Sequence, residues 1–229
     1  TNSFTVTVDY TGPPSGTVNT DGLTFSTNDD TDCSIVGIWD AGTTTCTLTA
    51  DINVSNNNEG IFITHPNITL DGAGHTITGL GTVTGQSSNS KAIMISSQMI
   101  ETTIKNLTIK NFKTGIEANY SNGLTITGVT MSDIGGYGIY SYGGDALKIE
   151  SNSISHLNTE LIAQTGIHLV GHNAYWGQGN GSCTGTGQYV NSSQDGPIVI
   201  KNNIITSTSG ESGSGVHIEG SKYCIDGNT

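Results

Sequence analysis

Apolar and polar residues alternate along most of the chain, and a repeated phrase organises this alternation. The phrase contains a Gly, a β-branched residue, a variable residue and a small or apolar residue. Its copies are Gly60–Ile63, Gly115–Ala118, Gly138–Ser141, Gly166–Leu169 and Gly215–Ile218, and Ala92–Ile95 is a version without the Gly. Successive Gly residues are 23 (115 to 138), 28 (138 to 166) and 49 (166 to 215) positions apart. Repeats of about 20–50 residues are typical of solenoids, and a period of two predicts strands.

A second phrase lies between the Gly phrases and has apolar residues five positions apart. Its copies begin at Ile104, Ile126, Ile149, Ile200 and Ile225. We expect these five residues to stack in one interior column of about six or seven coils. Aligning the copies also places Asn152, Asn203 and Asn228 in one column. Because Asn tolerates the left-handed backbone region, this column predicts a ladder of side-chain amides at a repeated turn.

These patterns predict an all-β protein with a parallel β-helix over residues 46–229 and a loop insertion at 171–197. Residues 1–45 lack the repeats. They contain an alternating segment at 4–8 and a turn rich in Gly and Pro at 12–16, so we expect an N-terminal β cap that also serves assembly. No apolar run approaches the roughly 20 residues of a membrane-spanning helix. We therefore expect no membrane span.

Charge and cysteine content indicate an extracellular protein. The 19 acidic residues outnumber the 7 basic residues, and the net charge of −12 argues against nucleic-acid binding. An even number of cysteines without metal-ligand spacing favours two disulfides, Cys33–Cys46 and Cys183–Cys224, over four buried thiols. Six glycosylation sequons agree with this location. They begin at Asn53, Asn67, Asn106, Asn119, Asn180 and Asn191.

The segment Ile68–Gly79, followed by the Gly phrases, carries a resemblance to a known fold class. It resembles the NosD-like, carbohydrate-binding and sugar-hydrolase (CASH) class of right-handed parallel β-helices, which belongs with the pectate-lyase-like folds. The resemblance covers roughly residues 46–229 and implies right-handed coils. This fold class includes polysaccharide lyases, hydrolases and epimerases, and also repeat domains of surface-layer, filament and adhesin proteins. The fold therefore does not decide the function.

The catalytic residues that this resemblance implies are not found at matching positions. Pectate lyases of this fold typically rely on an Arg base, and the chain contains no Arg. Asn19–Asp21 and Asp29–Asp30 match two polygalacturonase motifs in letters, but they precede the coils, and the other motifs of that family are missing. Glycoside hydrolysis needs two carboxylates about 5–9.5 Å apart, and no such pair stands out. We name no catalytic residue and favour a non-enzymatic function.

Three histidines are candidate metal ligands. His168 and His217 occupy the same outward position of two Gly phrases, and His172 follows four residues after His168. Two or three imidazoles on one face could hold copper or zinc. The alternative is a column of solvated surface residues. That column would also contain Phe62, Met94, Glu117 and Tyr140.

A second candidate metal segment precedes the coils. Asn28, Asp30 and Asp32 have the spacing of the first oxygen ligands of a calcium loop. The segment lacks the Gly and the distal Glu of an EF-hand, which favours a polar turn. We therefore expect no cofactor, with calcium as the alternative.

The insertion supplies the remaining candidate surface, with Tyr175, Trp176 and Tyr189 in a Gly-rich loop. Exposed aromatic residues bind sugars or protein partners, whereas aromatic residues that fold back would cover the solenoid flank.

Three functions then compete: a structural protein that self-assembles into a filament, sheath or surface layer, a carbohydrate-binding module, and a polysaccharide-active enzyme. We favour the first. The chain stops inside a phrase, at Asp226–Thr229, and the N-terminal region of another copy could cover this open coil. Such a head-to-tail contact would propagate as a homopolymer.

Overall fold

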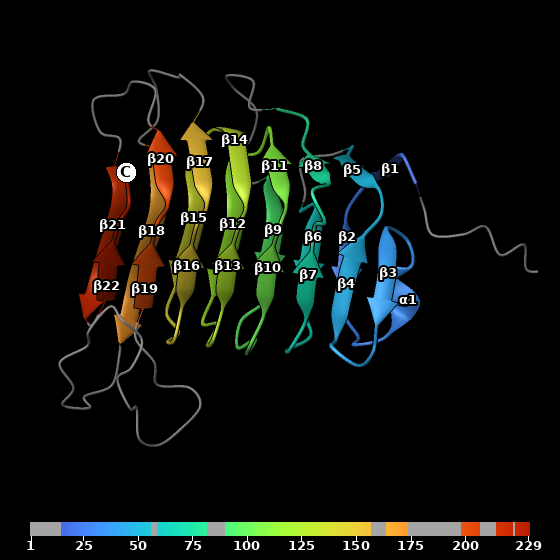
Figure 1. Cartoon of the computed structure of the whole chain (residues 1–229), viewed down its shortest axis with the longest axis horizontal. Coiled ribbons are helices and arrows are strands. Elements are labelled where there is room, and N and C mark those ends of the chain that lie inside the picture. The colour runs from blue at the N-terminus through green and yellow to red at the C-terminus, as the bar shows by residue number, and fades with distance from the viewer. Residues whose placement is uncertain are drawn as a thin grey trace, which may run out of the picture.

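The computed structural model describes residues 15–55, 59–81, 90–156, 164–173, 198–206, 214–221 and 223–229. Its strands stack along the long axis of the molecule, from the N-terminal end, which carries the one short helix of these residues, to the C-terminal end (Figure 1). Three sheets result, and the chain visits them in a fixed order, with one strand in each sheet per coil. This arrangement confirms the predicted all-β parallel β-helix.

Within each sheet, every strand is hydrogen-bonded to the strands of the preceding and following coils. Sheet A runs in the order β1 (Thr17–Thr20), β5 (Asp51–Val54), β8 (Thr76–Thr78), β11 (Thr108–Lys110), β14 (Thr130–Ile134), β17 (Ser153–His156) and β20 (Ile204–Thr206). Sheet B runs in the order β2 (Leu23–Phe25), β6 (Ile61–Ile63), β9 (Lys91–Ile95), β12 (Thr114–Asn119), β15 (Tyr137–Tyr142), β18 (Thr165–Asn173) and β21 (Ser214–Ser221). Sheet C runs in the order β3 (Gly37–Asp40), β4 (Thr45–Leu48), β7 (Thr69–Asp71), β10 (Thr103–Lys105), β13 (Thr125–Thr127), β16 (Lys148–Glu150), β19 (Ile198–Lys201) and β22 (Tyr223–Asp226).

The interior column predicted from the second phrase lies in sheet C. Successive register partners across β10, β13, β16, β19 and β22 are Ile104, Ile126, Ile149, Ile200 and Ile225. The first four are fully buried, and Ile225 is 45% exposed. Sheet C has eight strands and only β3 among them is antiparallel, so seven parallel strands remain, in agreement with the expected number of coils. Burial of each Ile side chain stabilises the folded chain by about 1.5–3 kcal/mol relative to an exposed side chain, through the hydrophobic effect.

The predicted asparagine ladder lies at the corner between sheets C and A. The Oδ1 atom of Asn203 accepts hydrogen bonds from the backbone N (3.0 Å) and the Nδ2 (2.9 Å) of Asn152. In the next coil, the Oδ1 of Asn228 accepts the same two bonds from Asn203, each at 2.8 Å. The left-handed backbone falls one residue before each Asn, at Ser151, Asn202 and Gly227. The ladder is therefore as predicted, whereas the turn conformation belongs to the preceding residue.

The N-terminal region contributes strands to the sheets before residue 46. β1 and β2 pair in parallel with β5 and β6, so they continue sheets A and B. From residue 15 onward in this region, only α1 (Asp30–Cys33) and β3 depart from the repeat, and β3 covers one end of sheet C as an antiparallel neighbour of β4. A disulfide joins α1 to β4 between Cys33 and Cys46, with an S–S distance of 2.03 Å, and this is the pair expected from the sequence.

Three predicted segments lie wholly or partly outside the described residues. The alternating segment at 4–8 and the start of the turn at 12–16 are among these. Of the insertion predicted at 171–197, the first three residues belong to β18, and residues 174–197 are not described. No helix in the described ranges has the length and apolar character needed to cross a bilayer.

Candidate functional site

The outer face of sheet B carries a column of side chains that the packing of the interior does not require. Its members are register partners on successive strands from β6 to β21. They are Phe62, Met94, Glu117, Tyr140, His168 and His217. Each is half-buried and lies between residues that face the interior. The repeated phrase predicted this column, including the adjacency of the two histidines.

The ring side chains of this face touch one another across three coils. The ring centroids of Tyr137 and Tyr140 are 5.2 Å apart, and each lies beside His168, at 5.0 and 5.5 Å. The ring of His168 in turn lies 4.7 Å from that of His217. We call these four residues the ring platform. The platform spans β15, β18 and β21 along the axis of the solenoid.

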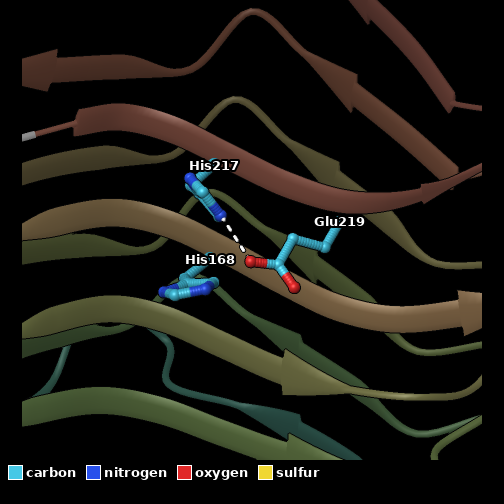
Figure 2. A group of neighbouring side chains, drawn as sticks. All are labelled: His168, His217 and Glu219. Atoms are coloured by element: carbon cyan, nitrogen blue, oxygen red, sulfur yellow. Dashed lines mark hydrogen bonds and ion pairs between the residues drawn. The ribbon is translucent and has the colours of Figure 1, made fainter.

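Glu219 brings a carboxylate to the C-terminal end of the ring platform. It lies two residues after His217 on β21 and therefore points to the same side of the strand. His217 Nε2 is 3.1 Å from Glu219 Oε1, and the His168 ring lies beside this pair (Figure 2). The candidate ligand atoms of His168, His217 and Glu219 all lie within 4.8 Å of one another. Among the described residues, these are the three histidine, cysteine or acidic side chains that lie close enough together to share a metal ion.

The surroundings of His168 favour its neutral form. Burial lowers the pKa of this imidazole, and a charge on His217 lowers it further, while Glu219 acts in the opposite direction. The Nδ1 atom of His168 is buried and has no hydrogen-bond partner among the described residues. The ring is therefore held by packing against other rings, not by a hydrogen bond at that nitrogen.

The prediction that His172 shares a face with the other two histidines is wrong. The pairing of β18 with β21 shifts register between Val170 and His172, and Gly171 has a φ of 69°. This irregularity reverses the direction of the next side chain. His172 is fully buried, with Nδ1 2.7 Å from the Gly144 carbonyl and Nε2 3.1 Å from the Ser141 carbonyl. The third candidate ligand beside His168 and His217 is therefore Glu219 and not His172. The sequence could have indicated this carboxylate, because residues two apart on a strand point to the same side and Glu219 follows His217 by two.

The acidic segment spans the N-cap and the first turn of α1. Asp29 caps α1 by accepting a hydrogen bond from the backbone N of Thr31 at 2.9 Å. Asp32 Oδ2 accepts a hydrogen bond from the backbone N of Ser26 at 2.8 Å. These contacts involve Asp29 and Asp32, and the choice between a polar turn and a calcium site at Asn28, Asp30 and Asp32 stays a prediction.

Several predicted residues are exposed or lie beyond the described ranges. The sequon residues Asn53, Asn67 and Asn106 are exposed and Asn119 is half-buried, while Asn180 and Asn191 are not described. Cys224 does not carry a free thiol, but its predicted partner Cys183 is not described. Tyr175, Trp176 and Tyr189 are also outside the described residues. Glycan occupancy, the second disulfide and the aromatic contacts of the insertion stay predictions.

Comparison with known families agrees with the architecture. A family model described as a right handed beta helix region matches residues 91–229. Searches among curated proteins and among solved structures give no match. The matched span begins at β9 and includes the whole ring platform together with Glu219.

Proposed function

Because the chain belongs to the family of right-handed β-helix regions, we propose that it is a rigid extracellular rod that binds an elongated carbohydrate along the outer face of sheet B. The ring platform is the observation that carries this proposal. Aromatic side chains that face outward give an apolar surface with polar tips. The apolar face of a sugar ring can pack on such a surface while its hydroxyl groups reach neighbouring polar side chains.

The arrangement of the platform suits a polymer better than a small, enclosed ligand. Neighbouring strands lie about 4.8 Å apart, so the rings follow the axis of the solenoid as an open row. Polar groups flank this row: Asn119 Nδ2 donates a hydrogen bond to Glu117 Oε1 at 3.3 Å, and Glu219 lies at the end. A sugar chain lying on the rings could hydrogen-bond to these carboxylate and amide groups.

The charges on this face favour a neutral carbohydrate over an acidic one. Lys91 Nζ lies between two carboxylates, 3.7 Å from Glu59 and 3.5 Å from Glu117, so its charge is offset locally. The chain as a whole carries a net charge of −12. An acidic polysaccharide would meet repulsion at this surface.

A titration of the full chain with soluble neutral polysaccharides, followed by calorimetry, tests the proposal. Replacing Tyr140 by Ala should weaken binding about two- to tenfold, the value of one aromatic contact. Tyr223→Ala is the control, because Tyr223 is an exposed tyrosine on sheet C. Unchanged affinity in Tyr140→Ala, or no binding by the unmodified chain to any neutral glycan, would contradict the proposal.

Head-to-tail assembly into a filament, sheath or surface layer is our second proposal. Its support is that the strands of sheets A and B are all parallel to one another and stack along one axis, so another copy could extend both ladders next to β1 and β2. The antiparallel β3 covers sheet C at this end, so the contact would continue two sheets only. Sedimentation at high concentration should detect polymers that deletion of residues 1–10 removes. A monomer under these conditions would argue against assembly.

A further inference from the structure

We propose that His168, His217 and Glu219 form a binding site for a divalent transition-metal ion of the Zn²⁺ type. The site would join two neighbouring coils, because His168 belongs to β18 and the other two residues belong to β21. This inference goes beyond carbohydrate binding and does not depend on it.

The backbone places the three side chains on one side of sheet B. His168 and His217 are direct register partners, and Glu219 follows His217 by two residues. His217 Nε2 and Glu219 Oε1 are 3.1 Å apart, and no two ligand atoms of the group are more than 4.8 Å apart. Ligand atoms around a tetrahedral Zn²⁺ are about 3.3 Å apart, given metal–ligand distances of about 2.0–2.2 Å. The widest pair must therefore approach by about 1.5 Å, which side-chain rotation can provide.

The kinds of ligand atom decide the class of ion. Two imidazole nitrogens with one carboxylate oxygen suit Zn²⁺ and its neighbours among the transition metals. Ca²⁺ and Mg²⁺ prefer sites made of oxygen ligands. Three protein ligands leave one tetrahedral position open to water or to an external ligand.

The unused nitrogen of His168 is a second, independent observation. Its Nδ1 is buried without a hydrogen-bond partner in the described part of the chain, although a buried polar atom of this kind costs about 1–3 kcal/mol when unsatisfied. The rings of Tyr137, Tyr140 and His217 hold the imidazole in place. The ring is thus oriented beside a second imidazole and a carboxylate while its hydrogen-bonding capacity is incompletely used. Coordination of an ion through Nδ1 would give this atom a partner.

Calorimetric titration of the metal-free full chain with Zn²⁺ near pH 7.5 tests the site. The expected result is one Zn²⁺ bound per chain at this cluster. The variants His217→Ala and Glu219→Gln should each weaken binding at least about tenfold. His65→Gln is the matched control, because His65 lies outside the cluster, with its Nδ1 2.8 Å from the Pro66 carbonyl. Ca²⁺ should give no signal that depends on Glu219.

Thermal unfolding with and without Zn²⁺ supplies a second readout. Zn²⁺ should raise the midpoint of the unmodified chain and of His65→Gln, and should raise that of Glu219→Gln much less. Glu219 is exposed, so the Gln variant is expected to fold even if His217→Ala does not. Unmodified affinity in Glu219→Gln and His217→Ala, or no binding by the unmodified chain at millimolar Zn²⁺, would overturn the proposal. Neither measurement contains a saccharide, so the outcome is separate from that of the carbohydrate proposal.

Discussion

At the scale of single residues, the corner between sheets C and A can be filled in two ways. Earlier coils place the buried apolar residues Leu107 and Val129 at this position, and later coils place Asn152 and Asn203 there. Each Asn donates a hydrogen bond to a carbonyl of the preceding coil, as Asn203 Nδ2 does to Ile149 O at 2.9 Å. The Oδ1 of each Asn accepts a hydrogen bond from the backbone N–H of the corner residue in the preceding coil. This holds also where that corner residue is apolar, as Val129 N–H donates to Asn152 Oδ1. The asparagines thus satisfy buried backbone groups that a hydrocarbon side chain would leave without partners.

The substitution Asn203→Leu should lower the free energy of unfolding by about 3–5 kcal/mol. It removes the acceptor of two donors of Asn152, although Asn152 Nδ2 keeps its bond to the Ile126 carbonyl, and it removes the side-chain donor to the Ile149 carbonyl. Each unsatisfied buried group costs about 1–3 kcal/mol. Urea unfolding monitored by circular dichroism measures this loss. Asn53→Ala, at an exposed strand position, is the control and should stay within about 0.5 kcal/mol of the unmodified chain. Equal effects of the two changes would contradict a role for the ladder.

Asp51 should make stability depend on pH in the acidic range. The backbone N–H of Thr76, 2.9 Å from Asp51 Oδ1, lowers the pKa of this carboxyl, and His75 adds to the shift, while partial burial opposes it. As the pH falls, Asp51 takes up a proton in the unfolded chain before it does so in the folded chain. Its stabilising contribution is therefore fully present above the pKa that Asp51 has in the unfolded chain. The contribution is lost as the pH falls through the lower pKa of Asp51 in the folded chain. Asp51→Asn should therefore be less stable than the unmodified chain at pH 7, with the difference shrinking near pH 3. A difference that does not change with pH in urea unfolding would refute this.

At the scale of the element, the Gly phrases allow neighbouring coils to approach closely. A Cβ atom built on Gly138 would lie 2.6 Å from the Gly166 carbonyl oxygen and 2.6 Å from Ile154 Cγ2. At the same position in the last phrase, Gly215, no atom of the described residues lies within 4 Å of such a Cβ. Ala92 occupies this column in another coil, so the restriction comes from the particular neighbours of each Gly and not from the phrase itself.

The pair Gly138→Ala and Gly215→Ala therefore separates packing from backbone effects. We expect Gly138→Ala to destabilise the fold by about 1–3 kcal/mol, the usual cost of overpacking. Gly215→Ala should change stability by less than about 0.5 kcal/mol. Urea midpoints of the two variants provide the comparison. If both variants lose the same stability, contact with the following coil is not the cause.

The repeated phrases made most strand positions predictable, because each copy supports the interpretation of the others. Ile126 and Ile149 could be assigned as neighbours, and so could His168 and His217, from alignment of phrases alone. The inward turn of His172 could not, because a single irregularity reverses the side of a strand on which later side chains lie. The contacts of α1 and β3 with the first coils could not be predicted from the repeat either, because neither element belongs to it. The spacing of the cysteines predicted one of these contacts, the disulfide between Cys33 of α1 and Cys46 of β4.

At the scale of the whole molecule, each coil contacts its neighbours and the interior is a row of stacked side chains. In such a solenoid, stability is approximately a sum of contributions from coils and from their interfaces. A buried residue should therefore matter according to the number of coils that cover it. Ile126 lies between Ile104 and Ile149 and is fully buried, whereas Ile225 in the same column is about half exposed.

Truncation at these two positions should give unequal losses. We expect Ile126→Ala to lower the free energy of unfolding by about 2–5 kcal/mol, since it leaves a cavity between two coils. Ile225→Ala should cost about 1 kcal/mol or less, because less of its surface is removed from water. Chemical denaturation of both variants tests this. Similar losses would show that the column does not act through stacking of neighbouring coils.

The direction of the asparagine ladder also sets an order in time. The corner N–H of Val129 is satisfied by Asn152, that of Asn152 by Asn203, and that of Asn203 by Asn228, which follow 23, 51 and 25 residues later. A ribosome releases the chain from its N-terminus at about 5–20 residues per second. Each of these corners therefore remains incomplete for seconds after its own coil has emerged, and the next stretch of nascent chain completes it.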